Sequence, residues 1–170
     1  MRKVLVLSDS HGDLTNARRV LAKLSAQIEM VIHLGDHDFD AIMLQKEYPQ
    51  LPFHYVRGNN DSGYDSPLSK VVRIAGKGIF VCHGHKQRVY WDLQNLIYGA
   101  EEEECQIALF GHTHRAFKQD IGGILALNPG SISVPRDGIV PTFAILMFDG
   151  ERIEASIMEC HGDSFRLRNA

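Results

Sequence analysis

The sequence predicts an α/β protein, and three observations lead to this fold class. Apolar runs alternate with amphipathic stretches up to residue 56, in the order β-α-β-α-β. The first run is apolar throughout, as expected of a parallel strand that is buried on both faces. Beyond residue 70 the strand-like segments follow one another more closely, so the second half is expected to contain more antiparallel strands.

The first half is expected to form three parallel strands joined by two helices, with right-handed crossovers. These elements are strand Val4–Leu7, helix 14–25, strand Met30–Leu34, helix Ala41–Tyr48 and strand Phe53–Val56. Asp13 is a suitable N-cap for the first helix, because its side chain can accept a backbone hydrogen bond. Pro49 ends the second helix.

The second half is expected to contain seven more strands and one helix. The strands are Lys70–Ile74, Ile79–Cys82, Ile107–Phe110, Ala116–Asp120, Ile124–Leu127, Thr142–Phe148 and Arg152–Met158. The loop Ala75–Gly78 contains two glycines and is suited to a hairpin. Residues 89–103 are expected to be helical, and Trp91 is expected to pack on the core-facing side of that helix.

Composition places the chain among ordinary folded proteins. It has 170 residues, of which 44% are apolar and 23% charged, and residues 1–170 are expected to form one domain. A net charge of −3 gives no basic surface for nucleic acid, so no nucleic-acid partner is expected. No apolar run reaches about 18 residues, so no membrane span is expected. Three cysteines without paired spacing favour a reducing, cytoplasmic location.

Five short polar strings each follow an apolar run, where a strand is expected to end. They are Asp9-Ser10-His11, Gly35-Asp36-His37-Asp38, Gly58-Asn59-Asn60-Asp61, His83-Gly84-His85 and Gly111-His112-Thr113-His114. Ligands bind at the carboxyl ends of strands in open α/β sheets, so these strings are expected to converge on one site. Their glycines suit sharp turns with positive φ and close approach of a phosphate to the backbone.

The residue types in these strings suit a pair of divalent metal ions. Asp9 and His11 are two positions apart and can reach one ion, and His112 and His114 have the same spacing. Asp36 offers a carboxylate able to bridge two cations. Nitrogen and oxygen donors without thiolate favour Mn²⁺, with Ni²⁺, Fe²⁺ and Zn²⁺ as alternatives. Two such ions about 3.5–4 Å apart would clamp a phosphate and activate a bridging water as nucleophile.

In their order, the five strings resemble the motifs of the calcineurin-like metallophosphoesterases. Asn128-Pro129-Gly130-Ser131 is similar to an element of the small bacterial and archaeal phosphodiesterase branch of that family. The resemblance implies a four-layer αββα sandwich with mixed β-sheets and a dinuclear metal site at the carboxyl ends of the strands. It also implies the metal ligands: Asp9, His11 and His114 for one ion, Asn59, His83 and His112 for the other, and Asp36 as the bridge.

Three further residues are candidates for a catalytic or supporting role. The resemblance implies that Asp61 steadies the loop or a nearby donor from behind the ligands. Many members of the family have His after the metal-binding Asn, whereas this chain has Asn60, which cannot donate a proton as an acid. Poor alkoxide leaving groups should therefore react slowly and activated or aryl diesters more readily. His85 could partly substitute, and Asn60 or Arg136 could still contact phosphate.

The function expected from these features is hydrolysis of small-molecule phosphodiesters by attack of a metal-bridging hydroxide. A phosphomonoesterase or nuclease of the same fold is an alternative. So is a non-catalytic scaffold such as the retromer's interaction subunit, in which the metal positions have decayed. A homodimer or higher homo-oligomer is also expected, because this branch often forms one. No Ser or Cys nucleophile accompanies the set, so no covalent intermediate is expected.

Overall fold

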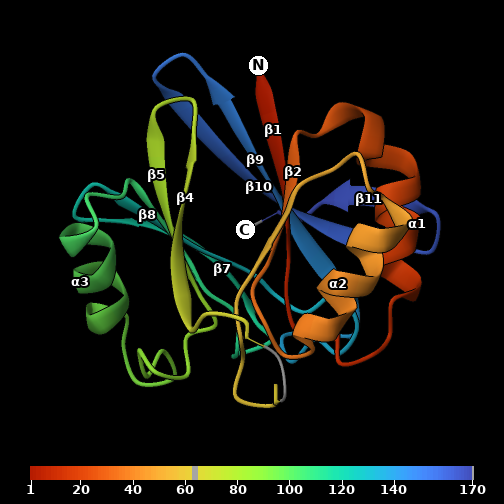
Figure 1. Ribbon diagram of the computed structural model, residues 1–170, viewed down its shortest axis with the longest axis horizontal. Helices are drawn as coiled ribbons and strands as arrows, with labels where there is room; N and C mark the ends of the chain where they lie inside the picture. Colours follow the sequence, from red (N-terminus) through yellow and green to blue (C-terminus); the bar gives the residue numbers. More distant parts are fainter. Residues whose placement is uncertain (63–64, 170) are drawn as a thin grey trace.

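Two β-sheets packed face to face, with helices on both outer faces, make up the computed structural model (Figure 1). It describes residues 1–62 and 65–169. Helices α1 (Thr15–Leu24) and α2 (Asp38–Glu47) cover one sheet, and α3 (Gln94–Glu102) covers the other. The expected four-layer αββα sandwich is therefore confirmed. A short 3-10 turn, Ser25–Gln27, follows α1.

Both sheets are mixed, and each contains three neighbouring parallel strands. The six-stranded sheet has the order β11-β10-β9-β1-β2-β3, in which β1, β2 and β3 are parallel. Its strands are β1 (Arg2–Leu7), β2 (Met30–His33), β3 (Phe53–Tyr55), β9 (Thr142–Asp149), β10 (Arg152–His161) and β11 (Ser164–Leu167). The five-stranded sheet has the order β4-β5-β6-β8-β7, in which β5, β6 and β8 are parallel. Its strands are β4 (Ser69–Ile74), β5 (Lys77–Cys82), β6 (Ile107–Leu109), β7 (Ala116–Ile121) and β8 (Ile124–Pro129).

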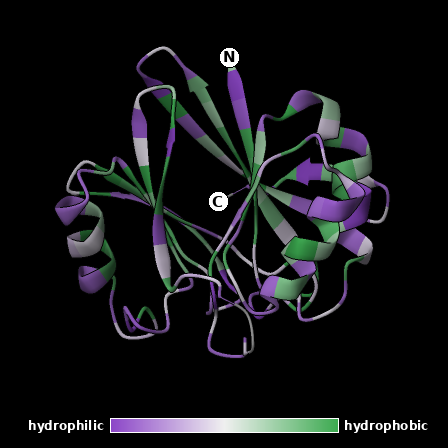
Figure 2. Ribbon diagram, viewed as in Figure 1, coloured by the Kyte–Doolittle hydropathy of each residue, from purple (hydrophilic) through white to green (hydrophobic). Residues whose placement is uncertain are grey.

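The main hydrophobic core lies between the sheets. Val6 and Ile32 from one sheet and Val81 and Leu109 from the other are fully buried in it. Two smaller cores lie beneath the helices, and Cys82 is buried under α3. Hydrophilic residues gather on the helices and connecting loops (Figure 2). Burial of apolar surface at about 25 cal/mol per Å² makes these layers the main stabilising contribution.

Parallel strands bring the loops after β1, β2, β3, β5 and β6 to the same end of the sandwich, at the bottom of Figure 1. These loops contain the five polar strings. The edge strands β4 and β7 run antiparallel to their neighbours. No helix among the described residues is long and apolar enough to cross a membrane.

Three local predictions need correction. Helix α2 begins at Asp38 rather than Ala41, because the Asp61 carboxylate accepts the N–H groups of His37 and Asp38 at its start. Helix α3 begins at Gln94, and residues 89–93 form turns before it. Trp91 in those turns is 80% exposed instead of packed.

Two details concern the ends of elements. Strand β11 was not expected, and it pairs with β10 after the turn at Gly162, which has a φ of +62°. The prediction of Asp13 as the N-cap of the first helix is wrong, although its Oδ1 accepts the N–H of Thr15 at 3.0 Å. Leu14 occupies the N-cap backbone position itself.

The hairpin between β4 and β5 is tighter than expected. Ile74 pairs with Lys77, which leaves a loop of two residues, Ala75 and Gly76. Their φ angles are +51° and +75°, the pattern of a type I′ turn. Ala75 is strained in this region, because its Cβ crowds the backbone there.

Replacing Ala75 by Asn, which creates the Asn-Gly pair that type I′ turns prefer, should raise the free energy of unfolding by about 0.5–1 kcal/mol. Urea unfolding of the metal-free protein measures the change. Gly76→Ala is the matched control and should be destabilising by about 1 kcal/mol through backbone strain alone, because a Cβ at this position meets nothing within 4 Å. Equal stability of the three proteins would contradict the turn assignment.

Candidate metal centre

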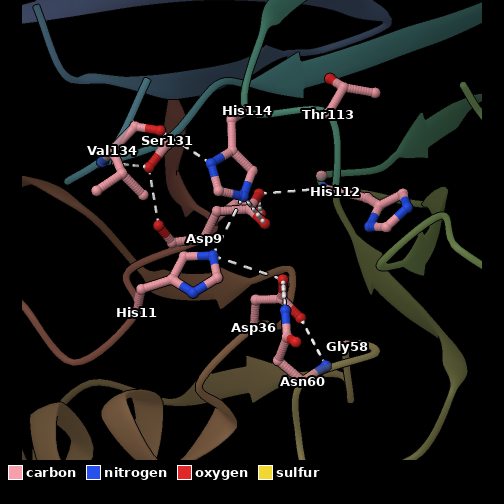
Figure 3. Close-up of polar contacts among 12 residues, drawn as sticks. Asp9, His11, Asp36, Gly58, Asn60, His112, Thr113, His114, Ser131 and Val134 are labelled. Carbon is pink, nitrogen blue, oxygen red and sulfur yellow. Dashed lines mark hydrogen bonds and ion pairs between the residues drawn. The ribbon is translucent and has the colours of Figure 1, made fainter. Parts of the chain in front are cut away.

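All seven predicted ligands lie together where the two sheets meet. One group contains Asp9, His11, Asp36 and His114, whose donor atoms lie within 4.8 Å of one another. His11 Nε2 is 3.1 Å from His114 Nε2 and 3.5 Å from Asp36 Oδ2. His114 Nε2 is 3.3 Å from Asp9 Oδ1. Figure 3 shows these side chains pointing toward a common centre from separate loops.

A second group shares Asp36 with the first. It contains Asp36, His83 and His112, again with donor atoms within 4.8 Å. His83 Nε2 lies 3.3 Å from Asp36 Oδ1 and 3.2 Å from His112 Nδ1. Asn59 Oδ1 is 3.1 Å from the same His83 nitrogen, which adds the amide oxygen to this group. Asp36 therefore directs one oxygen toward each group.

Several donor atoms in this cluster have no proton to share. His83 Nδ1 lies 2.7 Å from the Leu34 carbonyl and His114 Nδ1 lies 2.8 Å from the Val134 carbonyl. Each Nδ1–H therefore donates to a carbonyl, which leaves the Nε2 lone pair directed into the cluster. Asp9 Oδ1 is buried and has no hydrogen-bond partner among the described residues. Such atoms are costly to bury unless cations lie between them, so the donor set fits a pair of divalent ions.

The charge state of the cluster suits cations as well. Burial alone would raise the pKa of Asp36, but the close approach of His83 and the two hydrogen bonds from Asn60 outweigh it and hold that pKa well below its usual range. Burial, helped by the neighbouring His83, lowers the pKa of His112 to about 4. Asp36 is therefore an anion and His112 a neutral imidazole near neutral pH, which are the forms that bind metals.

The ligand loops carry unusual backbone strain. Asp9, His11, Asp36, His112 and His114 all have positive φ, between +49° and +68°. This left-handed region is uncommon for residues with a Cβ, and strain of this kind concentrates at functional sites. The strained conformation turns the side chains inward from the ends of the strands.

Glycines in the strings serve two different purposes. Gly12, Gly35 and Gly84 have positive φ, as the sequence predicts. Gly58 and Gly111 do not, and close packing requires them instead. A Cβ at Gly58 would lie 2.2 Å from Asp36 Oδ1, and one at Gly111 would lie 2.1 Å from Ser8 Oγ and 2.7 Å from Asp9 Oδ2.

Asp61 holds the loops in place and does not face the cluster itself. Its Oδ1 accepts the N–H groups of His37 and Asp38, at 2.6 and 3.1 Å. Its Oδ2 accepts those of Asp36 and Gly58, at 3.1 and 2.7 Å. One carboxylate thus joins the loop after β2 to the loop after β3, in the supporting role that the resemblance implies.

Asn60 lies against the bridging carboxylate. Its side-chain amide donates to Asp36 Oδ2 at 2.8 Å and its backbone N–H donates to Asp36 Oδ1 at 3.1 Å (Figure 3). His85 lies at the rim, with its ring 5.5 Å from that of His83 and 6.1 Å from that of His112. Its Nδ1 is buried without a hydrogen-bond partner among the described residues, and burial lowers its pKa.

The Asn-Pro-Gly-Ser element at the end of β8 supports ligand loops of both sheets. Asn128 donates its amide to the Gly111 carbonyl at 2.9 Å, and Ser131 donates its hydroxyl to the Asp9 carbonyl at 2.8 Å. Ser133 donates to the Ser10 carbonyl at 2.7 Å. These bonds connect the two halves of the chain directly behind the cluster.

Sequence reasoning missed a buried network behind the first ligand loop. Gly35 N–H donates to His33 Nδ1, so His33 Nε2–H donates to Ser10 Oγ at 2.9 Å. Ser10 in turn donates to Asp40 Oδ2 at 2.7 Å. One feature of the sequence indicates this network: His33 lies within an otherwise apolar run that forms a buried strand. A buried histidine needs hydrogen-bond partners.

Tyr90 and Arg136 adjoin the cluster at the surface. Tyr90 donates its hydroxyl to the His112 carbonyl at 3.2 Å, and Arg136 donates to the Tyr90 oxygen at 2.6 Å. No sequence pattern singles out Tyr90, because it falls within residues 89–103, which are expected to form a helix.

Comparison with known proteins identifies the family. Residues 2–151 match the calcineurin-like phosphoesterase superfamily domain. A probable metallophosphoesterase of Bacillus subtilis, YsnB, is 33% identical over 149 residues, covering 87% of this chain and 85% of that protein. A phosphodiesterase of Methanocaldococcus jannaschii, MJ0936, is 27% identical over 176 residues, covering 92% and 99%. The chain therefore belongs to the calcineurin-like phosphoesterase family.

Solved structures agree with this assignment. A predicted phosphoesterase from Streptococcus pneumoniae has a TM-score of 0.80 and 29% identity, covering 98% of each chain. The zinc complex of Vps29 from Entamoeba histolytica has a TM-score of 0.79 at 22% identity, covering 98% of this chain and 97% of that chain. At that identity the second likeness shows the fold alone. The chain is therefore a metallophosphoesterase of the calcineurin-like class with a cluster suited to divalent metals.

Replacing Asp61 by Ala should weaken metal binding by about 10–100-fold, because supporting residues behind metal ligands contribute on this scale. The loss arises from four N–H groups that lose their acceptor and release the Asp36 loop. Titration of the metal-free protein with Mn²⁺ measures it. Asp61→Asn keeps one acceptor oxygen and should lose less, and an affinity unchanged in Asp61→Ala would refute the positioning role.

Stability of the metal-free protein should fall as pH drops below about 6.5, in part through His33. Burial lowers the pKa of His33 from its usual 6.5, because the charged imidazolium would be removed from water. The unfolded chain therefore binds this proton more readily, so the contribution of His33 is complete above the unfolded pKa and is lost on acidification.

Urea unfolding at several pH values, with a chelator present, measures this effect. His33→Asn should be less stable than the wild type at neutral pH but lose less stability on acidification, because it has no proton to gain. A parallel loss of stability in both proteins would show that His33 does not contribute.

Proposed function

We propose that this protein is a metal-dependent phosphodiesterase that hydrolyses small-molecule phosphodiesters. The observation that carries the proposal is the sharing of Asp36 between two ligand groups. The first ion would be held by Asp9, His11 and His114, and the second by Asn59, His83 and His112. A carboxylate between two cations lowers their mutual repulsion and keeps them close enough to bind one phosphate.

When bound, the two ions would activate a water molecule and neutralise charge on the phosphoryl oxygens. The chain's own contribution is rigidity. Asp61 and Asn60 hold Asp36 from two sides, and the carbonyls of Leu34 and Val134 orient His83 and His114. Ligands that are held in place lose less entropy when the substrate binds.

Leaving-group preference follows from Asn60. Both of its hydrogen bonds go to Asp36, and its amide has no acidic proton to give. An aryl leaving group departs as a stable anion and needs no acid. An alkoxide leaving group is much more basic and needs a proton from an acid. His85 at the rim is the remaining candidate for a donor to the leaving group, although burial lowers its pKa.

Manganese is the proposed metal, because the donors are nitrogen and oxygen without thiolate. The three cysteines are free and buried, which supports a cytoplasmic location. The net charge of −3 argues against a nuclease. We also propose that the protein forms a homodimer or a higher homo-oligomer.

A scaffold of the same fold is the second candidate, because Vps29 structures resemble this chain closely in fold. The complete ligand set argues against it, since a scaffold has no need to keep seven converging donors. Metal content decides between the two. Reconstituted protein should hold about two ions per chain, and fewer than about one would favour the scaffold.

Turnover of bis(4-nitrophenyl) phosphate by the Mn²⁺-loaded protein tests the enzymatic proposal. Asp36→Ala and His112→Ala should each lower kcat/KM by at least about a hundredfold, because each removes a metal ligand. His161→Ala is the matched control: this histidine bonds Glu159 on β10, outside the cluster, and should leave turnover unchanged. Undiminished turnover in the first two variants would refute the mechanism.

Comparison of 4-nitrophenyl phosphate with bis(4-nitrophenyl) phosphate separates monoesterase from diesterase activity, because both release the same leaving group. We expect the higher kcat/KM on the diester. A clear preference for the monoester would establish the alternative phosphomonoesterase function.

A further inference from the structure

An apolar pocket of about 330 Å³ lies beside the metal cluster, between the turns that precede α3 and strand β7. Val89 and Phe110 are buried beneath it, and Leu93 and Phe117 form parts of its walls. The Phe110 and Phe117 rings are 6.0 Å apart. None of these residues belongs to the ligand set or supports it.

Tyr90 is the wall that the pocket shares with the cluster. Its ring lies edge-on to the His112 ring at 4.8 Å between centroids and also lines the pocket. Although Tyr90 is 52% exposed, both roles of its hydroxyl are taken, by the His112 carbonyl and by Arg136. An exposed aromatic ring held in this way is a preorganised binding surface, because little side-chain entropy remains to be lost.

Thr113 makes the pocket continuous with the cluster along the chain. It lies between the ligands His112 and His114, and Figure 3 shows its side chain turned away from the carboxylates. Its hydroxyl accepts a hydrogen bond from Asn128 and donates one to the Arg115 carbonyl. The hydroxyl is therefore occupied, and the pocket offers apolar surface more than hydrogen bonds.

Two cations flank this region. Arg115 lines the pocket, and Arg136 lies at the Tyr90 hydroxyl. A molecule that places an anionic phosphoryl group at the cluster and an apolar ring in the pocket would match both the charge and the polarity of the surface. A purely polar or purely apolar molecule would match only one part.

We propose that this pocket is the subsite for an aromatic ester group of the substrate, with Tyr90 as its specificity-determining wall. The inference deepens the proposed function, on which it rests, by naming the substrate class as phosphodiesters that carry an aromatic ring. The aromatic ring packs between Tyr90 on one wall and Leu93 and Phe117 on the other, while the phosphoryl group lies at the cluster.

Binding of two phosphonates to the Mn²⁺-loaded protein tests the subsite without turnover, because their P–C bonds are not cleaved. Methylphosphonate and phenylphosphonate share one anionic head and differ in the ring. Titration calorimetry should give phenylphosphonate roughly tenfold tighter binding, which corresponds to burial of about 50 Å² more apolar surface.

Variants then locate the preference. Tyr90→Ala and Leu93→Ala should each reduce the roughly tenfold preference to about threefold or less. Tyr90→Phe keeps the ring but loses both hydroxyl contacts, so its preference should be intermediate. Tyr98→Ala is the matched control: Tyr98 is also 52% exposed, lies on α3 and does not line the pocket, so the full preference should remain.

The outcomes separate the subsite from the proposed function. Equal affinities for the two phosphonates in the wild type would overturn the subsite and leave the phosphodiesterase proposal standing. A preference that survives in both Tyr90→Ala and Leu93→Ala, or that is lost in Tyr98→Ala, would overturn its location. Absence of binding by either phosphonate would contradict the proposed function, and the subsite would fall with it.

Discussion

Asp36 presents one carboxylate oxygen to His11 at 3.5 Å and the other to His83 at 3.3 Å, and both oxygens also accept hydrogen bonds from Asn60. Two loops from different sheets thus meet at a single anion. Both ligand groups include Asp36, so each of them loses a donor if its carboxylate moves. The geometry of the cluster therefore depends on a fixed position of Asp36. The four N–H groups gathered by Asp61, and the glycine at position 58 that leaves room for the carboxylate, both serve this requirement.

The same requirement explains why the strain of the ligand loops is tolerated. Five ligands have positive φ, and the surrounding structure determines their positions from several directions. Ser131 and Ser133 bind the carbonyls of the first loop, while Asn128 binds the loop after β6. The two serine bonds form only when both sheets are packed, so the site depends on the core between the sheets and not on any one loop.

The proposed metal centre and the proposed aromatic subsite occupy different places at this end of the sandwich. The donors converge in the interior, whereas Tyr90, Thr113 and Arg136 lie on the His112 side at the surface. Asn60 gives its hydrogen bonds to Asp36, so in the proposed reaction the rate would depend on the leaving group, and an aromatic ester would supply a stable one. The apolar pocket and the missing acid at residue 60 are therefore consistent with the same kind of substrate.

The sequence by itself determined the alternation of parallel strands and helices in the first half, the resemblance to the family and the residues whose donors gather, because buried strands and their polar ends leave a local pattern. Only the tertiary structure decided what depends on contacts between distant segments. The start of α2 at Asp38 depends on Asp61, and the need for glycine at 111 depends on Ser8 and Asp9. The exposure of Trp91 and the role of Tyr90 follow from turns that helical spacing cannot distinguish from a helix. Local patterns record which residues a strand end offers, whereas long-range packing decides what those residues touch.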